Sequence, residues 1–293
     1  MQVKLVISGG DSFTFGSELH NDIINPSPSK LSWANLIAEK LNAKHINVAE
    51  GGRSNSFIAR HVINKIYEAL QLISKPEDIF VQVMWTFVAR QEIAVNFATK
   101  RMDSPWFPLD PHVCEDETES DWFKELPRDS ETWQSLYDGM HKRFLINKSL
   151  GLIDFSIEYY KVTGNLQDTY TSLKEILMLQ DFLEARNVRY MFTYVDNNVI
   201  KGLKSIDKFT SGLNSFIKFD EWFDFPGVVG FNDWAKANEY EYGVYHPLEK
   251  AHEDAADIIY EEKVKHIFDT DKREFTFRKR LKELRKKDPF IYE

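Results

Sequence analysis

The apolar and polar positions of the first 85 residues follow two alternating patterns. Short stretches at 3–7, 46–49 and 78–85 that are mostly apolar predict buried strands, because a strand covered on both faces needs apolar residues at most positions. At 31–41 and 57–73, apolar residues recur every three or four positions, which predicts helices with one apolar face. Strands that alternate with helices in this way build a parallel sheet. We therefore predict an α/β fold, a flavodoxin-like three-layer α/β/α sandwich with a mostly parallel, doubly wound sheet.

The same patterns return in the second half of the chain. Helical periodicity covers roughly 140–162 and 166–186, and the apolar run at 188–194 predicts a fourth strand that ends near Asp196. A last helix is predicted with Pro247 in its first turn, where the fixed φ of proline suits a helix start. The second half therefore adds further units to the same sheet.

Two stretches interrupt the pattern, and the chain ends in a basic segment. Residues at about 96–140 and 197–240 have no clear period, so we predict two irregular insertions into one domain of residues 1–270. Residues 271–293 are predicted as a basic C-terminal tail or helix. An acidic partner and the protein's own acidic surface both stay open as contacts of this tail.

Composition narrows the class of protein. In a chain of 293 residues, 43% hydrophobic residues are enough for a sizeable core. The net charge of −9 repels phosphate, so no specific nucleic-acid partner is predicted. The single cysteine, Cys114, excludes an intrachain disulfide, and no stretch approaches the roughly 20 apolar residues of a membrane span. We expect a soluble cytoplasmic protein, or one located in a virion or host cytoplasm if it is phage-encoded.

Candidate chemistry follows the first predicted strand. The sequence Gly-Gly-Asp-Ser ends that strand in a turn and places Asp11 and Ser12 at its carboxyl end, where ligands bind in open α/β sheets. A serine hydroxyl is a weak nucleophile and needs a base, for which His246 is the candidate. Asp and Ser also favour turns and helix caps, so a purely structural role for both residues stays open.

Three segments together resemble the conserved blocks of the SGNH, or GDSL-type, hydrolase superfamily. GDSFTFG at 10–16 resembles the first block, NVAEGGRSN at 47–55 the second, and YHPLEKAHEDAA at 245–256 the last. The resemblance implies Ser12 as nucleophile and His246 as base. It further implies that the backbone N–H groups of Ser12 and Gly52 are oxyanion donors.

Two positions depart from that family pattern. The family's third block usually supplies an Asn after the third strand, whereas VMWTFVARQE has Thr86 and Arg90 there instead. The acid that orients the histidine usually lies three residues before it, and Gly243 occupies that position. Asp196 is our candidate for the missing acid, with Glu241 as a second possibility.

Further binding candidates near the same strand ends are Asp11, Asn55, Thr86 and Arg90. No cofactor and no metal are predicted, since the histidines show no metal-ligand spacing, and His252 is expected on a helix surface.

We therefore predict a serine esterase acting on a small ester, with an O-acetyl group on a glycan as one candidate. The alternative is a divergent, phage-like fold that has lost catalysis and serves as a viral structural or glycan-binding module. The missing Asn and Asp are what such a loss would produce.

Overall fold

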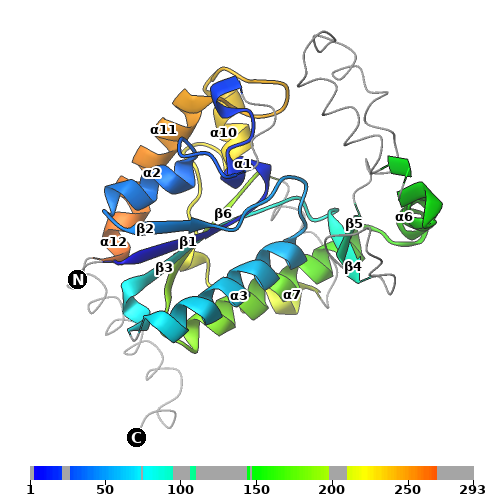
Figure 1. Ribbon diagram of the computed structural model, residues 1–293, viewed down its shortest axis with the longest axis horizontal. Helices are drawn as coiled ribbons and strands as arrows, with labels where there is room; N and C mark the ends of the chain where they lie inside the picture. Colours follow the sequence, from blue (N-terminus) through cyan, green and yellow to red (C-terminus); the bar gives the residue numbers. More distant parts are fainter. Residues whose placement is uncertain are drawn as a thin grey trace, which may run out of the picture.

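A four-stranded parallel sheet forms the centre of the molecule (Figure 1). The computed structural model describes residues 3–21, 27–73, 75–94, 106–109, 144–145, 147–197 and 210–268. The strand order is β2-β1-β3-β6. These strands are Lys44–Asn47 (β2), Leu5–Gly9 (β1), Ile79–Trp85 (β3) and Arg189–Tyr194 (β6). The chain winds outward from β1 in both directions, which confirms the predicted doubly wound sheet.

Helices cover both faces of this sheet. Figure 1 shows α2 (Trp33–Lys40) and α11 (Glu249–Ile259) on one face, with α3 (Asn55–Leu72) and α7 (Asn165–Glu184) on the other. Every residue of β1, β3 and β6 is buried as a result. The mostly apolar stretches of the sequence therefore reflect strands that are covered on both faces. The predicted three-layer α/β/α arrangement is confirmed.

Local capping explains where two of these helices begin. The Ser32 side chain accepts a hydrogen bond from the N–H of Asn35 at the start of α2, and the Ser54 side chain accepts one from Phe57 at the start of α3. Each serine satisfies an N–H group that the first turn of a helix leaves without an internal partner.

Shorter elements complete the described part of the chain. The helices are α1 (Ser12–Phe15), α6 (Leu152–Val162), α9 (Thr210–Asn214), α10 (Phe231–Ala237) and α12 (Lys265–Ile267). Strands β4 (Gln91–Ala94) and β5 (Trp106–Leu109) form an antiparallel pair. Single turns of 3₁₀-helix occupy Leu19–Asn21, Pro76–Asp78 and Phe219–Glu221, and Tyr260–Val264 is π-helical.

The second predicted insertion, 197–240, is not irregular throughout the part that the structure describes. Residues 210–240 contain a regular helix, α10, and the N–H of Phe223 donates to the carbonyl of Phe192 in β6 at 2.8 Å. Trp222, Phe225 and Trp234 are buried in the main core. These aromatic residues therefore belong to the core, and α10 is too short to give a clear period in the sequence.

Other predictions fall partly or wholly outside the described residues. Of the first predicted insertion, 96–105 and 110–140 lie outside them, whereas 106–109 forms β5 rather than irregular structure. The basic tail at 271–293 also lies outside the described residues. Among those described, no helix is long and apolar enough to cross a membrane.

Candidate active site

The turn after β1 presents Ser12 at the carboxyl end of the sheet. Asp11 is the N-cap of the short helix α1, and its side chain accepts a hydrogen bond from the N–H of Phe13 at 3.1 Å. A Cβ at Gly10 would lie 2.0 Å from Oγ1 of Thr14, so the turn needs glycine there. Ser12 is the first residue of α1, where helix N–H groups have no partner within the helix.

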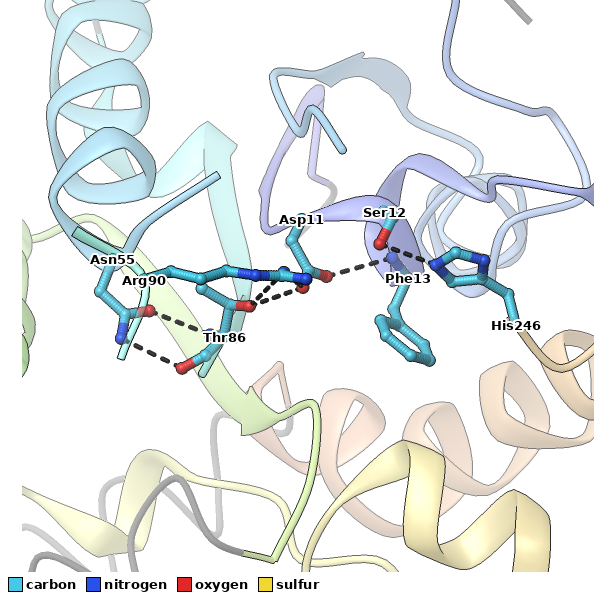
Figure 2. A network of polar contacts seen from close by, with 7 residues as sticks. All are labelled: Asp11, Ser12, Phe13, Asn55, Thr86, Arg90 and His246. Carbon is cyan, nitrogen blue, oxygen red and sulfur yellow. Dashed lines mark hydrogen bonds and ion pairs between the residues drawn. The ribbon is translucent and has the colours of Figure 1, made fainter. Parts of the chain in front are cut away.

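Ser12 contacts the histidine that the sequence proposed as its base. Its Oγ lies 2.8 Å from Nε2 of His246, although the two residues are 234 positions apart in the chain. Figure 2 shows the hydroxyl of Ser12 pointing toward the imidazole ring, with the ring of Phe13 nearby. The Phe13 and His246 rings meet edge to face, with centroids 4.7 Å apart. This packing restricts the orientation of the imidazole.

Glu18, which the sequence analysis missed, lies behind the other nitrogen of the ring. Its Oε1 is 2.9 Å from Nδ1 of His246. Glu18 thus occupies the position for which Asp196 was predicted, with Glu241 as a second candidate, and that assignment is corrected. Asp196 instead follows β6, where its backbone packs so closely on Gly230 that a Cβ there would lie 2.2 Å from the Asp196 Cα.

The same carboxylate also holds the backbone of the histidine segment. Oε2 of Glu18 accepts hydrogen bonds from the N–H groups of Tyr245 at 3.0 Å and His246 at 3.2 Å. Burial by itself raises the pKa of Glu18, but the hydrogen bonds from His246 and Tyr245 and the charge of His246 lower it overall. An ionised carboxylate only accepts hydrogen bonds, so Nδ1 of His246 donates to it, and in the neutral ring Nε2 faces the Ser12 hydroxyl as a hydrogen-bond acceptor.

The glycine turn after β2 approaches Ser12 from another side. A Cβ at Gly51 would lie 3.8 Å from the Cβ of Ser12, which brings this turn next to the nucleophile candidate. Gly52 adopts a left-handed φ of 70°, a conformation that glycine takes at little cost. Its N–H stays our prediction for an oxyanion donor.

A buried ion pair supports the opposite side of the Ser12 turn. Oδ2 of Asp11 accepts hydrogen bonds from the Thr86 hydroxyl at 2.6 Å and from Nη1 of Arg90 at 2.8 Å. Figure 2 shows this cluster and Ser12 on opposite sides of Asp11. The Asp11 side chain is fully buried, whereas that of Arg90 is 20% exposed. Thr86 and Arg90, which stand where the family's Asn was expected, therefore bind the residue that caps α1.

Asn55 belongs to this supporting structure and is not exposed for binding. Its side chain donates to the carbonyl of Thr86 at 3.1 Å and to the hydroxyl of Ser172 at 3.0 Å. It also accepts from the N–H of Thr86 at 2.9 Å. Both N–H bonds of the amide are thus used within the protein, as are the hydroxyl and N–H of Thr86. The predicted binding roles of Asn55 and Thr86 are therefore corrected to structural ones.

His252 is another correction. It is fully buried in α11, and its Nδ1 accepts a hydrogen bond from the N–H of Trp33 at 3.1 Å. Burial lowers its pKa to about 3, so the ring is neutral and serves packing rather than solvent contact. Within the described part of the chain, no group of three or more His, Cys, Asp or Glu side chains is placed to hold a metal ion.

The sequence contained only a weak signal for Glu18. The glycine at 243 showed that the acid was missing from its usual place, and Glu18 lies six residues after Ser12. Nothing in the pattern indicates that residues 18 and 246 meet across 228 positions, because Glu18 lies in a turn with a left-handed φ of 69°. Such a turn has no periodic pattern of apolar residues from which its position could be predicted.

Comparison with known proteins finds similarity in solved structures. No family model matches this chain, and no curated protein matches it. A member of the lipolytic protein G-D-S-L family from Veillonella parvula is 11% identical with a TM-score of 0.41, over 89% of this chain and 99% of its own. The psychrotrophic esterase EstA from Pseudoalteromonas is 11% identical with the same TM-score, over 89% and 97% of the two chains. An acetyl xylan esterase from Butyrivibrio proteoclasticus is 12% identical with a TM-score of 0.41, over 89% and 65%. At these identities, no residue role transfers from those proteins to this chain.

Proposed function

We propose that this protein is a serine hydrolase of carboxylic esters, with Ser12 as nucleophile and His246 as general base. The observation that carries the proposal is the 2.8 Å contact between Ser12 Oγ and His246 Nε2 at the carboxyl end of a parallel sheet. A hydroxyl hydrogen-bonded to a neutral imidazole nitrogen is the arrangement that makes serine nucleophilic. We also propose that the chain is a divergent member of the SGNH, or GDSL-type, superfamily.

The proposed reaction has two steps. Ser12 Oγ attacks the ester carbonyl carbon while its proton passes to His246 Nε2, and the carbonyl oxygen becomes negative. The tetrahedral intermediate collapses, and His246 returns the proton to the departing alcohol, which leaves an acyl group on Ser12. Water then attacks this acyl-enzyme and gives a proton to His246. The second tetrahedral intermediate collapses, His246 returns the proton to Ser12 Oγ, and the carboxylic acid is released.

The negative oxygen needs preorganised donors. We assign this role to the backbone N–H groups of Ser12, at the start of α1, and of Gly52, in the glycine turn beside it. Loss of one such donor lowers the rate of comparable enzymes by about 10²–10³-fold. Arg90, whose side chain is partly exposed, stays a candidate for contact with the substrate.

The substrate is proposed only as a class: a small ester, with an O-acetyl group on a glycan as the first candidate. Two exposed apolar residues, Val244 and Tyr245, directly precede His246. An exposed aromatic ring beside the base offers a surface on which a sugar ring can stack. No nucleic acid and no cofactor are part of the proposal.

The alternative is a fold that binds a glycan without catalysis. The contact of Ser12 with His246, and of His246 with a carboxylate, favours the hydrolase, since a binding module gains nothing from this alignment.

Hydrolysis of p-nitrophenyl esters from acetate to octanoate tests the proposal. We expect activity in the wild-type protein, labelling by a fluorophosphonate probe, and a loss of at least about 10³-fold in Ser12→Ala. The control is Ser215→Ala, which alters an exposed serine whose hydroxyl bonds the carbonyl of Gly212. Equal hydrolysis and labelling in wild type and Ser12→Ala would reject Ser12 as nucleophile. Lack of both in the wild type would favour the binding module.

A further inference from the structure

Glu18 makes more contacts with the base segment than a surface carboxylate needs. One oxygen contacts Nδ1 of His246, and the other accepts from the backbone N–H groups of Tyr245 and His246. The side chains of Glu18 and His246 are each only 12% exposed. A charged group in so enclosed a place is retained only where its hydrogen bonds are satisfied, and here three donors converge on it.

The local backbone is bent to deliver this side chain. Gly16 ends α1 with a left-handed φ of 79°, and Glu18 follows with a φ of 69°. A left-handed conformation is unfavourable for a residue other than glycine. The contacts of the Glu18 carboxylate offset this cost, and such strain concentrates at functional sites.

Gly243 shows that the carboxylate fills a particular space. A Cβ built at Gly243 would lie 2.3 Å from Oε2 of Glu18 and 3.2 Å from its Cβ and Cδ. The φ of Gly243 lies outside the left-handed region, so its backbone accepts an ordinary side chain. Glu18 is therefore what a side chain at 243 would meet first among the described residues.

We propose that Glu18 is the positioning acid of the Ser12–His246 pair, and that its carboxylate occupies the space a carboxylate from residue 243 would otherwise fill. This inference rests on the proposed hydrolase function. Nucleophile and acid then both come from the segment after β1, and only the base comes from the segment before α11. Glu18 holds the proton on Nδ1 and stabilises the imidazolium that forms when Nε2 takes the proton of Ser12.

A purely structural role for Glu18, in which it only ties residues 243–246 to the Ser12 segment, makes a different prediction. A structural connection of this kind is preserved in Glu18→Gln, because the amide oxygen still accepts hydrogen bonds from backbone N–H groups. A positioning acid is not preserved, because an amide carries no charge to stabilise an imidazolium. The tautomer of His246 is then also less firmly held.

The decisive experiment compares Glu18→Gln, Glu18→Ala and the double variant Glu18→Ala/Gly243→Asp in p-nitrophenyl acetate hydrolysis. We expect kcat to fall about 10²–10⁴-fold in both single variants, with KM within about threefold of wild type. The double variant should regain at least tenfold over Glu18→Ala, because the new carboxylate enters the space that Glu18 leaves. Glu253→Gln serves as matched control, since it neutralises an exposed carboxylate of α11, the helix that follows the base segment.

The outcomes separate this inference from the proposed function. If Ser12→Ala abolishes hydrolysis while Glu18→Gln keeps kcat within threefold of wild type, Glu18 is not the acid and the hydrolase stands. A large loss of kcat in Glu241→Gln or Asp196→Asn, but not in Glu18→Gln, would assign the role of positioning acid to that residue instead. Thermal melting checks that each variant folds. A folded double variant that regains no activity would refute the claim that carboxylates at 18 and 243 occupy the same space. If Ser12→Ala keeps full activity, the function itself fails.

Discussion

The part of the chain that the structure describes contains two serine–histidine contacts of nearly equal length. Ser12 Oγ lies 2.8 Å from Nε2 of His246, and Ser8 Oγ lies 2.7 Å from Nε2 of His45. The two serines are four residues apart in the chain, one inside β1 and the other just after it. The distance between oxygen and nitrogen therefore does not distinguish a candidate nucleophile from a structural serine.

The groups behind each histidine make the first difference. Nδ1 of His246 faces the Glu18 carboxylate at 2.9 Å, whereas Nδ1 of His45 faces the neutral amide oxygen of Asn35 at 3.0 Å. Burial lowers the pKa of His45 to about 4, so that ring stays neutral. A carboxylate stabilises an imidazolium, and an amide does so far less, which suits only the first pair to proton transfer.

Position in the sheet makes the second difference. Ser8 is fully buried in a strand paired on both sides, and its hydroxyl also accepts from the Gln82 amide at 2.8 Å. Its N–H belongs to the sheet and is not available to an oxyanion. Ser12 lies beyond the strand, beside the glycine turn at Gly51. The end of the strand, rather than the serine–histidine distance, thus makes a catalytic serine feasible.

Replacing each of the two serines by alanine is the strongest test of this comparison, because the two variants should lose different properties. Ser12→Ala should remove at least about 10³-fold of the esterase activity with little change in stability. Ser8→Ala should leave kcat within about twofold, but cost on the order of 1–3 kcal/mol, because His45 and Gln82 each lose a buried partner. Ester hydrolysis and chemical denaturation of both variants measure these effects. Loss of activity in a fully folded Ser8→Ala would contradict the distinction.

The charged support of the Ser12 turn provides the next test. Asp11→Asn leaves Arg90 without its buried counter-ion and should destabilise the protein by about 3 kcal/mol, with a lower kcat because the turn holding Ser12 shifts. Removing both charges in Asp11→Asn/Arg90→Met should recover at least about 1 kcal/mol of that stability. Urea unfolding curves give both values. An Asp11→Asn protein as stable as wild type would mean that this ion pair does not hold the turn.

The sequence predicted the features that depend on short-range pattern. Strand and helix order follow from apolar periodicity, and Ser12 and Gly52 follow glycine turns at strand ends. The predicted pairing of Ser12 with His246 is met by the 2.8 Å contact between Oγ and Nε2.

Features that depend on long-range contacts or strained turns could not be predicted. Glu18 meets His246 only because a left-handed turn directs it there. The residues 210–240 contain core aromatics that only the packing against β6 reveals as such. The sequence places Asn55 near the same strand ends as Thr86 and Arg90, and only its hydrogen bonds to Thr86 and Ser172 reveal its structural role.

Acidification should lower the stability of the protein through His45, the partner of Ser8. The folded-state pKa of His45 is about 4, below its ordinary value of 6.5, so protonation favours the unfolded chain. Its contribution to stability is complete above about pH 6.5 and is lost as the pH falls through about 4, on the order of 1–2 kcal/mol for this partly buried ring. Unfolding free energies of wild type and His45→Gln should therefore converge between these pH values. A constant difference would show that His45 does not titrate with folding.

Asn35→Asp is the test with the smallest expected effect. It places a carboxylate behind His45 in the Ser8–His45 pair, as Glu18 lies behind His246. The new carboxylate should raise the pKa of His45, because it faces Nδ1 in place of the amide oxygen. It should also lose the hydrogen bonds that the Asn35 amide donates to the carbonyl of Lys30 and to Glu39. Titration of the His45 ring by NMR, with Asn35→Ala as control, measures the shift. In the Ser12→Ala background this variant should still hydrolyse no ester, because the Ser8 hydroxyl stays enclosed in the sheet with its N–H in the strand ladder. Restored hydrolysis would show that the carboxylate alone, and not the place at the end of the strand, separates the two pairs.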